Sequence, residues 1–381
     1  MKYIGVMSGT SLDGIDATMV DIPDTKTLPL AVRVLGHRFM EWDPHLRRDL
    51  LSLGNGTAFV AQSIVRLAQA VSEAYVTLIL RLLQELHTDP NAVVAIGMHG
   101  QTVWHEPPEA NHLGYSWQLG SPSWVANRTR ITTVGDFRLS DLALGGHGAP
   151  LAPYAHRVLF YDPSRMVGVL NIGGISNVTL IDPDPICAPV ASDLGPGTMI
   201  IDALCQSHSQ GRQLMDKDGK MAARGTLDQT LVHELLTGPF FEKDPPKSTG
   251  RETFGSHYVE KFLHLAPDDA ITTASWLTVK SIATGITRLG SPKALYVAGG
   301  GAKNPWILSR LQESLKDIPV HTTDALGLPV DQVETIAFAL LARATIHKEA
   351  ANLPTVTGSN GAAILGTVAE TIREGSMPWG K

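Results

Sequence analysis

A strand–glycine turn–strand pattern opens the chain and returns near its middle, and it constrains the fold more than any other feature. The first copy is Tyr3-Ile-Gly-Val-Met-Ser-Gly-Thr-Ser-Leu-Asp-Gly-Ile-Asp16, and the second is Val167-Gly-Val-Leu-Asn-Ile-Gly-Gly-Ile-Ser-Asn-Val-Thr-Leu-Ile181. Apolar residues on both sides of a glycine turn predict a β-hairpin. A duplication of this kind predicts two similar α/β domains that face one cleft.

The first turn is rich in hydrogen-bond donors. Ser8-Gly-Thr-Ser11 can direct several N–H and O–H groups at one anion. Gly9 and Gly14 permit backbone angles that a Cβ disfavours. Asp13 and Asp16 lie where a carboxylate could reach a Mg²⁺ ion carried by a nucleotide. An ordinary glycine hairpin is the alternative interpretation of this turn.

A third glycine cluster lies in the second half of the chain. Gly299-Gly-Gly301 follows an apolar strand at 294–297, and Asn304-Pro305 then favours the start of a helix. A strand, a glycine turn and a helix allow the backbone to approach a nucleotide. Neither the G-x-G-x-x-G fingerprint nor the G-x-x-x-x-G-K-[ST] loop occurs at this position.

Composition excludes several classes of partner. The chain has 381 residues, which suffices for two domains with cores of their own. Its net charge of −6 and dispersed Lys and Arg give no reason to expect nucleic acid or an anionic membrane surface as partner. No uncharged run reaches the ~20 residues of a membrane helix. The 14 histidines do not show zinc-site spacing.

The same features predict a cytoplasmic protein. Met1-Lys2-Tyr3 leads directly into the first expected strand, without a signal-peptide apolar region. Cys187 and Cys205 fit a reducing compartment better than a disulfide framework.

Periodicity gives a coarse map of the chain. We expect a first domain at 1–150, with completion by the C-terminal segment as an option, and a second domain at 151–381, with the loop 145–153 as crossover. Strands are expected near 3–8, 15–22, 31–41, 92–98 and 131–135, and helices near 44–53, 59–87 and 122–129. In the second half, helices are expected near 198–208, 217–236, 257–264, 270–289, 304–317 and 332–347.

Asp193 is the best catalytic candidate. It lies at a strand end before Gly195-Pro-Gly197, which suits a general base. The alternative is that Asp193 only caps the next helix. Glu334 is by default a first-turn acid favoured by the helix dipole. Arg138 could bind an acidic substrate or pair with a neighbouring Asp. Lys247 and Arg251 lie in a polar loop that could bind phosphate or form a solvated lid. His99 and His147 are interpreted as satisfied loop histidines.

Motifs along nearly the whole chain resemble one family. They are Met7-Ser-Gly-Thr-Ser-Leu-Asp-Gly-Ile-Asp16, His99-Gly-Gln-Thr102, Gln118-Leu-Gly120, Asp136-Phe-Arg138, Gly148-Ala-Pro150, Asn171-Ile-Gly-Gly-Ile-Ser-Asn177, Pro246-Lys-Ser-Thr-Gly-Arg-Glu252, Gly299-Gly-Gly301 and Val333-Glu-Thr-Ile-Ala-Phe338. In this order they resemble the anhydro-N-acetylmuramic acid kinases.

The resemblance implies two ribonuclease-H-like domains of the actin, sugar kinase and Hsp70 type around a central nucleotide cleft. It implies a reaction that uses ATP and Mg²⁺ to open the 1,6-anhydro bond of anhydro-N-acetylmuramic acid and to phosphorylate O6. The products would be N-acetylmuramic acid 6-phosphate and ADP, in peptidoglycan recycling. Members of this family are usually homodimers.

Carried over by position, the resemblance also implies roles for individual residues. Asp193 would activate water, and Asp13 would hold the metal. The expected ATP-binding residues are Gly9, Thr10, Ser11, Leu12, Asp13, Gly14, Ile15, Asp16, Gly299, Gly300, Gly301 and Asn304. The expected substrate-binding residues are Gln101, Thr102, Arg138, Asn177 and Glu334. The chain departs from the family pattern Asp-Thr-Gly-Pro-Gly-Asn at Leu194 and Thr198, which puts substrate preference and rate in question.

Three other readings stay open at this point. Levoglucosan kinase resembles the same family and does not need to bind a lactyl carboxylate. An ordinary hexokinase-type enzyme of the superfamily would phosphorylate a free sugar. A non-enzymatic, nucleotide-dependent binding module would need a peptide-binding domain, for which the expected map leaves no room.

Overall fold

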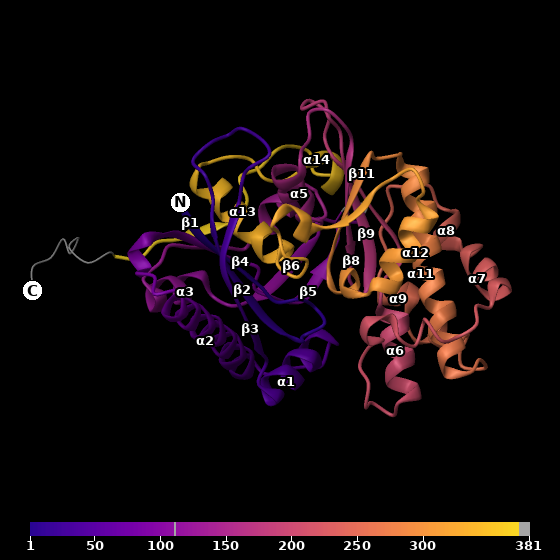
Figure 1. Cartoon of the computed structure of the whole chain (residues 1–381). Coiled ribbons are helices and arrows are strands. Elements are labelled where there is room, and N and C mark those ends of the chain that lie inside the picture. Colours follow the sequence, from indigo (N-terminus) through magenta and orange to yellow (C-terminus); the bar gives the residue numbers. More distant parts are fainter. Residues whose placement is uncertain (110–111, 373–381) are drawn as a thin grey trace, which may run out of the picture. The chain divides into compact units, whose positions relative to one another are not determined.

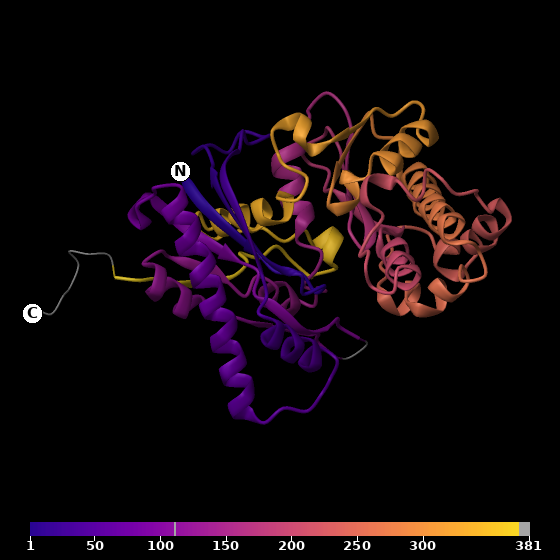
Figure 2. The same cartoon turned by 60° about the horizontal axis from the view of Figure 1, so that its bottom comes forward.

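The computed structural model describes residues 1–109 and 112–372 and divides the chain into two compact units. Unit 1 consists of Met1–Leu159 and the C-terminal segment that begins at Glu334. Unit 2 consists of Phe160–Val333. Figures 1 and 2 both show the C-terminal segment, in yellow, among the indigo and purple elements of unit 1. The C-terminal segment therefore completes the first unit, which is the option that the sequence left open. The first part of that unit extends to 159 rather than 150, and the second unit ends at 333 rather than at 381.

Unit 1 is built on a six-stranded sheet in the order β13-β7-β4-β1-β2-β3. Its strands are β1 (Lys2–Met7), β2 (Gly14–Asp21), β3 (Arg33–Glu41), β4 (Val93–Met98), β7 (Thr133–Gly135) and β13 (Thr367–Ala369). Strands β1, β2 and β3 form an antiparallel meander, whereas β4 and β7 run parallel to β1 and to each other. The expected hairpin at the start of the chain is confirmed.

Unit 2 repeats this arrangement in a five-stranded sheet, β10-β9-β8-β11-β12. Its strands are β8 (Val167–Ile172), β9 (Ile175–Ile181), β10 (Val190–Pro196), β11 (Ala294–Ala298) and β12 (Val320–Thr322). Again the first three strands are antiparallel, and the last two run parallel to the first. The shared order 3-2-1-4-5 is that of a ribonuclease-H-like sheet, so the predicted duplicated fold class is confirmed.

Helices cover both faces of the unit 1 sheet. They are α1 (Pro44–Gly54), α2 (Ala61–Glu85), α3 (Pro122–Thr129), α4 (Leu139–Ala143), α5 (Ala152–Phe160), α13 (Val333–Ile346) and α14 (Pro354–Thr357), with a 3₁₀ turn at Pro90–Ala92. A separate hairpin, β5 (Gln101–Glu106) with β6 (Tyr115–Leu119), follows β4.

Alternation along β1 assigns each of its faces to a different helix. Ile4 and Val6 join the hydrophobic cluster that contains the buried face of α2. Gly5 points the other way and pairs in register with Gly97 of β4. A Cβ on either glycine would meet the backbone of α13, at Thr335 and Phe338 respectively. These two glycines therefore let α13 lie directly on the sheet, which fixes the position of Glu334 in its first turn.

Helix α2 is the one described helix that is long and apolar enough to cross a membrane by length and composition. Its buried residues, which include Leu67, Val71, Tyr75 and Ile79, pack in the unit 1 core. A core helix of this kind meets the same criterion.

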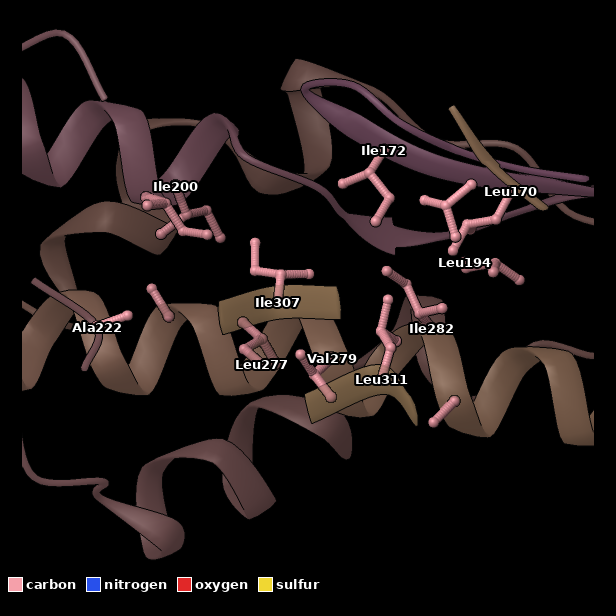
Figure 3. Close-up of a cluster of buried hydrophobic side chains, with 14 of the residues drawn as sticks. Leu170, Ile172, Leu194, Ile200, Ala222, Leu277, Val279, Ile282, Ile307 and Leu311 are labelled. Carbon is pink, nitrogen blue, oxygen red and sulfur yellow. The ribbon is translucent and has the colours of Figure 1, made fainter. Parts of the chain in front are cut away.

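Unit 2 has its own hydrophobic core between the sheet and its helices. These are α6 (Met199–His208), α7 (Gln229–Leu236), α8 (Pro239–Glu242), α9 (Arg251–Phe254), α10 (Ser256–Glu260), α11 (Pro267–Leu289) and α12 (Pro305–Ser314), with 3₁₀ turns at Lys217–Gly219, Gly300–Lys303 and Thr323–Leu326. Figure 3 shows Leu170, Ile172 and Leu194 from the strands facing Ile282, Ile307 and Leu311 from the helices.

Two expected features differ from the structure. The helix predicted across 217–236 is only a 3₁₀ turn at its start and α7 at its end. Asp218 and Gly219 adopt positive φ, and a Cβ on Gly225 would meet the backbone of Asp268, so an uninterrupted helix is excluded. The domain boundary also lies later than 150. Leu151 and Tyr154, at the start of α5, pack with Phe338 and Leu341 in the unit 1 cluster.

Candidate active site

The turn between β1 and β2 presents an open, polar surface. Thr10, Ser11 and Asp13 are exposed, and a Cβ on Gly9 would meet Ser11 at ordinary contact distance, with its hydroxyl at 3.5 Å. Leu12 is buried with φ 56°, and its N–H donates to the Gly9 carbonyl at 3.2 Å. The Arg47 Nε donates to the Leu12 carbonyl at 2.7 Å. The turn is thus held from within while its outer donors stay accessible.

Buried polar groups fix the first residues of this turn. Ser8 is 1% exposed, and its hydroxyl hydrogen-bonds the Tyr75 hydroxyl at 2.6 Å. The His99 Nδ1 lies 3.0 Å from the Ser8 carbonyl. The Gln101 Nε2 donates to the Gly9 carbonyl at 3.3 Å. Burial raises the pKa of Tyr75, so its hydroxyl stays protonated.

Arg138 is oriented by two hydrogen bonds. Its Nη1 donates to the Gly148 carbonyl at 2.9 Å, and its Nη2 donates to the His99 Nε2 at 2.9 Å. Burial lowers the pKa of the guanidinium to about 10, and nearby Glu334 opposes this shift. Arg138 therefore stays charged at neutral pH. Within the described part of the chain, its Nε is buried without a hydrogen-bond partner.

Glu334 and the residues after β4 complete the unit 1 cluster. Glu334 is exposed in the first turn of α13. Desolvation by surrounding protein raises its pKa, the Asp16 carboxylate raises it further, and Arg138 opposes both. The Thr102 hydroxyl accepts a hydrogen bond from the Gln118 amide at 3.2 Å. The buried Gln101 Oε1 is a second polar atom that has no partner among the described residues.

Asp193 lies on β10 in register with Asn177 of β9, which in turn pairs with Asn171 of β8. The three polar residues form one row across the unit 2 sheet. The Thr249 N–H donates to the Asp193 carboxylate at 2.8 Å. Burial raises the pKa of Asp193 to about 6, the Thr249 N–H lowers it, and the Glu252 carboxylate raises it. A partly buried carboxylate with this pKa is mainly ionised at neutral pH and can accept a proton.

The loop that carries Thr249 is anchored to the same strand. The Asp193 N–H donates to the Lys247 carbonyl at 2.9 Å. The Lys247 ammonium donates to the carbonyls of Phe240 and Lys243 at 2.8 and 2.9 Å and lies over the Phe240 ring. Lys247 therefore has a structural position in this conformation. The Arg251 side chain lies outside the part of the structure that is described.

The Gly173-Gly174 turn between β8 and β9 is packed against the turn after Asp193. The N–H groups of Gly197 and Thr198 donate to the carbonyls of Gly174 and Gly173, both at 2.8 Å. A Cβ on Gly197 would meet the Gly173 carbonyl. This close approach fixes the strand end that carries Asp193.

The glycine cluster after β11 contains positions of two kinds. A Cβ on Gly299 would meet Asn171, and a Cβ on Gly301 would meet Ile172, so both are required by packing. Gly300 is exposed, and a Cβ there would have nothing within 4 Å. The Asn304 Oδ1 accepts from the N–H groups of Trp306 and Ile307, so its carbonyl end caps α12. Only Gly300 presents free space to a ligand.

The two departures from the family pattern have different surroundings. Leu194 is 2% exposed and packs in the unit 2 core, where Gly285 of α11 leaves room for it. Its side chain therefore belongs to the core rather than to the polar row of Asp193. Thr198 is half-buried at the start of α6, without a side-chain capping bond. The departure at Leu194 is a change in packing.

The donor set fits a magnesium ion carried by a nucleotide better than a metal cage made by the protein. The described residues contain no group of three or more His, Cys, Asp or Glu placed to hold a metal. Asp13 is a single exposed carboxylate in the polar turn. Mg²⁺ commonly takes one or two carboxylates together with phosphates and water.

Each unit gathers part of the expected site. Unit 1 brings the turn 9–16 together with Gln101, Arg138 and Glu334, and unit 2 brings Asp193 together with Asn177 and, through Asn171, Gly299. Sequence reasoning missed the supporting groups at Tyr75, His99, Asn171 and Thr249. Asn171, His99 and Thr249 carried a signal, because each lies in one of the motifs, whereas Tyr75 carried none.

Comparison with known proteins places the chain in a family. The family model described as anhydro-N-acetylmuramic acid kinase matches residues 1–371. The anhydro-N-acetylmuramic acid kinase of Vibrio vulnificus is 39% identical over 372 residues, covering 96% of this chain and 97% of that protein. The enzyme of the same name from Haemophilus influenzae is 38% identical over 382 residues, with 96% and 97% covered. Among solved structures, an activator of 2-hydroxyisocaproyl-CoA dehydratase from Clostridium difficile with bound ADPNP is 11% identical with a TM-score of 0.47, covering 93% of this chain and 99% of that chain. On the family match and these identities, the chain belongs to the anhydro-N-acetylmuramic acid kinase family.

Proposed function

We propose that the chain is an ATP-dependent kinase that hydrolyses the 1,6-anhydro bond of anhydro-N-acetylmuramic acid and phosphorylates O6. The products are N-acetylmuramic acid 6-phosphate and ADP, and the reaction serves peptidoglycan recycling. The family match and the identity to enzymes of this name support the proposal. The observation that carries it is the carboxylate of Asp193, which has a pKa of about 6 and is held by the Thr249 N–H.

In this proposal Asp193 takes a proton from the water that attacks the anomeric carbon. The bond between that carbon and O6 breaks, and O6 takes the γ-phosphoryl group of ATP. One base is enough, because phosphorus captures the leaving oxygen. The step resembles the base half of an inverting glycosidase. The elevated pKa suits the role, because a base works best when its pKa lies near the working pH.

The glycine turns would hold the nucleotide. The residues of the first turn, Gly9 to Asp16, would direct their N–H and O–H groups at the phosphates. Gly299 to Gly301 and Asn304 would lie against the rest of the nucleotide, with the open face of Gly300 as the closest approach. Mg²⁺ bound with Asp13 would neutralise phosphate charge, which phosphoryl transfer requires.

Unit 1 offers partners for the sugar. We assign the lactyl carboxylate to Arg138, because this guanidinium stays charged and its Nε has no partner among the described residues. We assign a hydroxyl or amide N–H of the sugar to Gln101, whose Oε1 is a buried acceptor without a partner in the same part of the structure. Thr102 and Glu334 on the unit 1 side, and Asn177 beside Asp193, are the remaining contacts proposed.

Incubation with ATP, Mg²⁺ and anhydro-N-acetylmuramic acid in ¹⁸O-water tests the proposal. Solvent ¹⁸O is expected at the anomeric hydroxyl of the phosphorylated product and not in its phosphate, measured before mutarotation exchanges that oxygen. Label in free inorganic phosphate would instead show hydrolysis of ATP by water. Higher kcat/KM with levoglucosan, which has no lactyl carboxylate, would overturn the substrate assignment.

The family resemblance also supports a cytoplasmic homodimer. Light scattering of the purified full-length chain tests the oligomeric state, and a mass of one chain would contradict it.

A further inference from the structure

His99 is a buried titratable group that the proposed reaction does not use. It follows β4 and is 5% exposed, and its ring packs against Phe338 with the ring centroids 5.0 Å apart. Its two nitrogens have partners of opposite kind. Nδ1 lies 3.0 Å from the Ser8 carbonyl, and Nε2 lies 2.9 Å from the Arg138 Nη2.

These partners allow one protonation state only. A carbonyl oxygen only accepts a hydrogen bond, so Nδ1 must carry a proton towards Ser8. A guanidinium only donates, so Nε2 must present its lone pair to Arg138. The ring is therefore the neutral Nδ1–H tautomer. A proton on Nε2 would replace the hydrogen bond to Arg138 with repulsion between two cations.

The imidazole joins two parts of the unit 1 cluster that are far apart in sequence. Ser8 begins the open turn, and Arg138 precedes α4. The Arg138 Nη1 is already held by the Gly148 carbonyl, so the bond to His99 fixes the second end of the planar guanidinium. With both ends held, the Nε, which has no partner among the described residues, can point in one direction only.

We propose that His99 is a positioning residue that holds the Arg138 guanidinium at a fixed orientation relative to the Ser8 carbonyl, so that Arg138 meets an anionic substrate group already aligned. The proposal rests on the function proposed above, because it takes the lactyl carboxylate as that group. His99 itself does not touch the substrate and is neither a general base nor a general acid.

The electrostatics of the ring agree with this geometry. Burial, together with the neighbouring Arg138 charge, lowers the pKa of His99 to about 3. The ring is therefore neutral at neutral pH. A neutral acceptor can hold a cation that would repel a protonated ring.

Two substitutions separate the two hydrogen bonds. His99→Asn places an amide near the position of Nδ1 and can still donate to Ser8, but it does not reach Arg138. His99→Gln reaches the position of Nε2 and can accept from Arg138. We expect His99→Asn to raise KM for anhydro-N-acetylmuramic acid by about 10- to 100-fold, the effect of one lost charged hydrogen bond, with KM for ATP changed less than about threefold. We expect His99→Gln to restore most of the sugar KM.

A double-mutant cycle separates positioning from a general loss of structure. In an Arg138→Gln background, His99→Asn is expected to change the sugar KM less than about twofold, because its effect passes through Arg138. His87→Asn, at an exposed histidine after α2, is the matched control. Additive losses in the double variant, or equal losses for ATP and sugar, would overturn the proposal.

Histidine ¹⁵N NMR of the full chain gives a readout that does not depend on the sugar. The His99 signals, assigned by their loss in His99→Asn, should show protonated Nδ1 and bare Nε2, unchanged from pH 5 to 8. The Nε2 signal should shift in Arg138→Gln. Titration of His99 in this range, or the opposite tautomer, would overturn the inference. A wild-type protein that is inactive on the sugar but shows this NMR pattern would instead refute the proposed substrate.

Discussion

The β1–β2 turn and the β8–β9 turn hold the same place in two sheets of the same strand order, yet their surroundings differ. In unit 1, Gly9 faces open space and the following hydroxyls are exposed. In unit 2, the carbonyls of Gly173 and Gly174 accept hydrogen bonds from the backbone after Asp193. The strand framework is therefore repeated in the two units, while the surroundings of the two turns differ.

The difference indicates how the repeated fold supports one reaction. The unit 1 turn is held from behind by Tyr75, His99 and Gln101, so its outer face is available for phosphate. The unit 2 turn has its carbonyls engaged by protein and acts as a brace for the strand of Asp193. We infer that one turn binds a ligand and the other positions a base.

The largest expected effect is on catalysis and comes from Asp193, whose strand is supported by the unit 2 turn. Asp193→Asn should lower kcat by about 10²- to 10⁴-fold, because it removes the proposed base while keeping a side chain of similar size. ATP affinity, measured by calorimetry, should stay nearly unchanged. Asp317→Asn, an exposed acid after α12, is the control. Near-normal turnover in a folded Asp193→Asn protein would remove Asp193 from its role.

Substitutions at the two glycines with free space around them should weaken nucleotide binding instead. Gly9→Val and Gly300→Val each add a side chain where the structure leaves free space, so stability should change by less than about 1 kcal/mol. ATP affinity should fall by about 100-fold or more, since the new methyl groups would occupy the space of the nucleotide. Calorimetry measures the affinity. Unchanged ATP binding in either folded variant would show that its glycine has another purpose.

Much of this contrast could be predicted from the sequence, because both hairpins have clear alternation and glycine turns. Asp193 and Arg138 could also be predicted, because each lies in a motif. The packing of the second turn could not be predicted, because the clash at Gly197 involves the Gly173 backbone, 24 residues earlier in the chain. Periodicity describes one element at a time and carries no information about such contacts.

The supporting groups were missed for the same reason. Tyr75 lies in a helix whose apolar pattern only predicts a core position, so nothing marks its hydroxyl as a partner of Ser8. The sequence around His99 predicts only a loop histidine. Its contact with Arg138 is known only from the structure. The prediction of a helix over 217–236 was wrong because Asp218 adopts a positive φ. Asp tolerates this conformation, but an Asp in the sequence does not by itself predict it.

A stability comparison sharpens the distinction between braced and free glycines. Gly197→Ala should lower the free energy of unfolding by about 1–3 kcal/mol, because its Cβ would meet the Gly173 carbonyl. Gly174→Ala, whose Cβ would meet Met199 at 3.6 Å, should cost less than about 0.5 kcal/mol. Denaturant titration measures both. Equal losses would mean that the second turn is not a brace.

The pH dependence of kcat/KM, which follows the ionisation of Asp193, gives a smaller effect. The pKa of Asp193 is raised to about 6, and the base must be ionised, so kcat/KM for the sugar should fall about tenfold between pH 7 and pH 5. The Glu252 carboxylate contributes to the raised pKa, so Glu252→Gln should move this acid limb to lower pH. Titration of the substrates would not move with that substitution. If the acid limb of the pH profile does not move in Glu252→Gln, a group other than Asp193 is responsible for it.

The smallest expected effect on activity concerns the residue beside the base. Leu194→Thr restores the family residue but exchanges a buried apolar side chain for a smaller one with a hydroxyl. Because Leu194 packs against Gly285 in the unit 2 core, the free energy of unfolding should fall by about 2–3 kcal/mol. KM for the sugar should change less than about threefold, since the side chain lies in the core rather than in the row of Asp193 and Asn177. Thr198→Asn, the other family residue, provides a favoured helix cap at the start of α6 and should not lower stability. Steady-state kinetics and denaturant titration of the two single variants separate packing from recognition. A large change in sugar KM for Leu194→Thr, without loss of stability, would show that position 194 acts on the substrate and that the brace and the binding surface are not distinct.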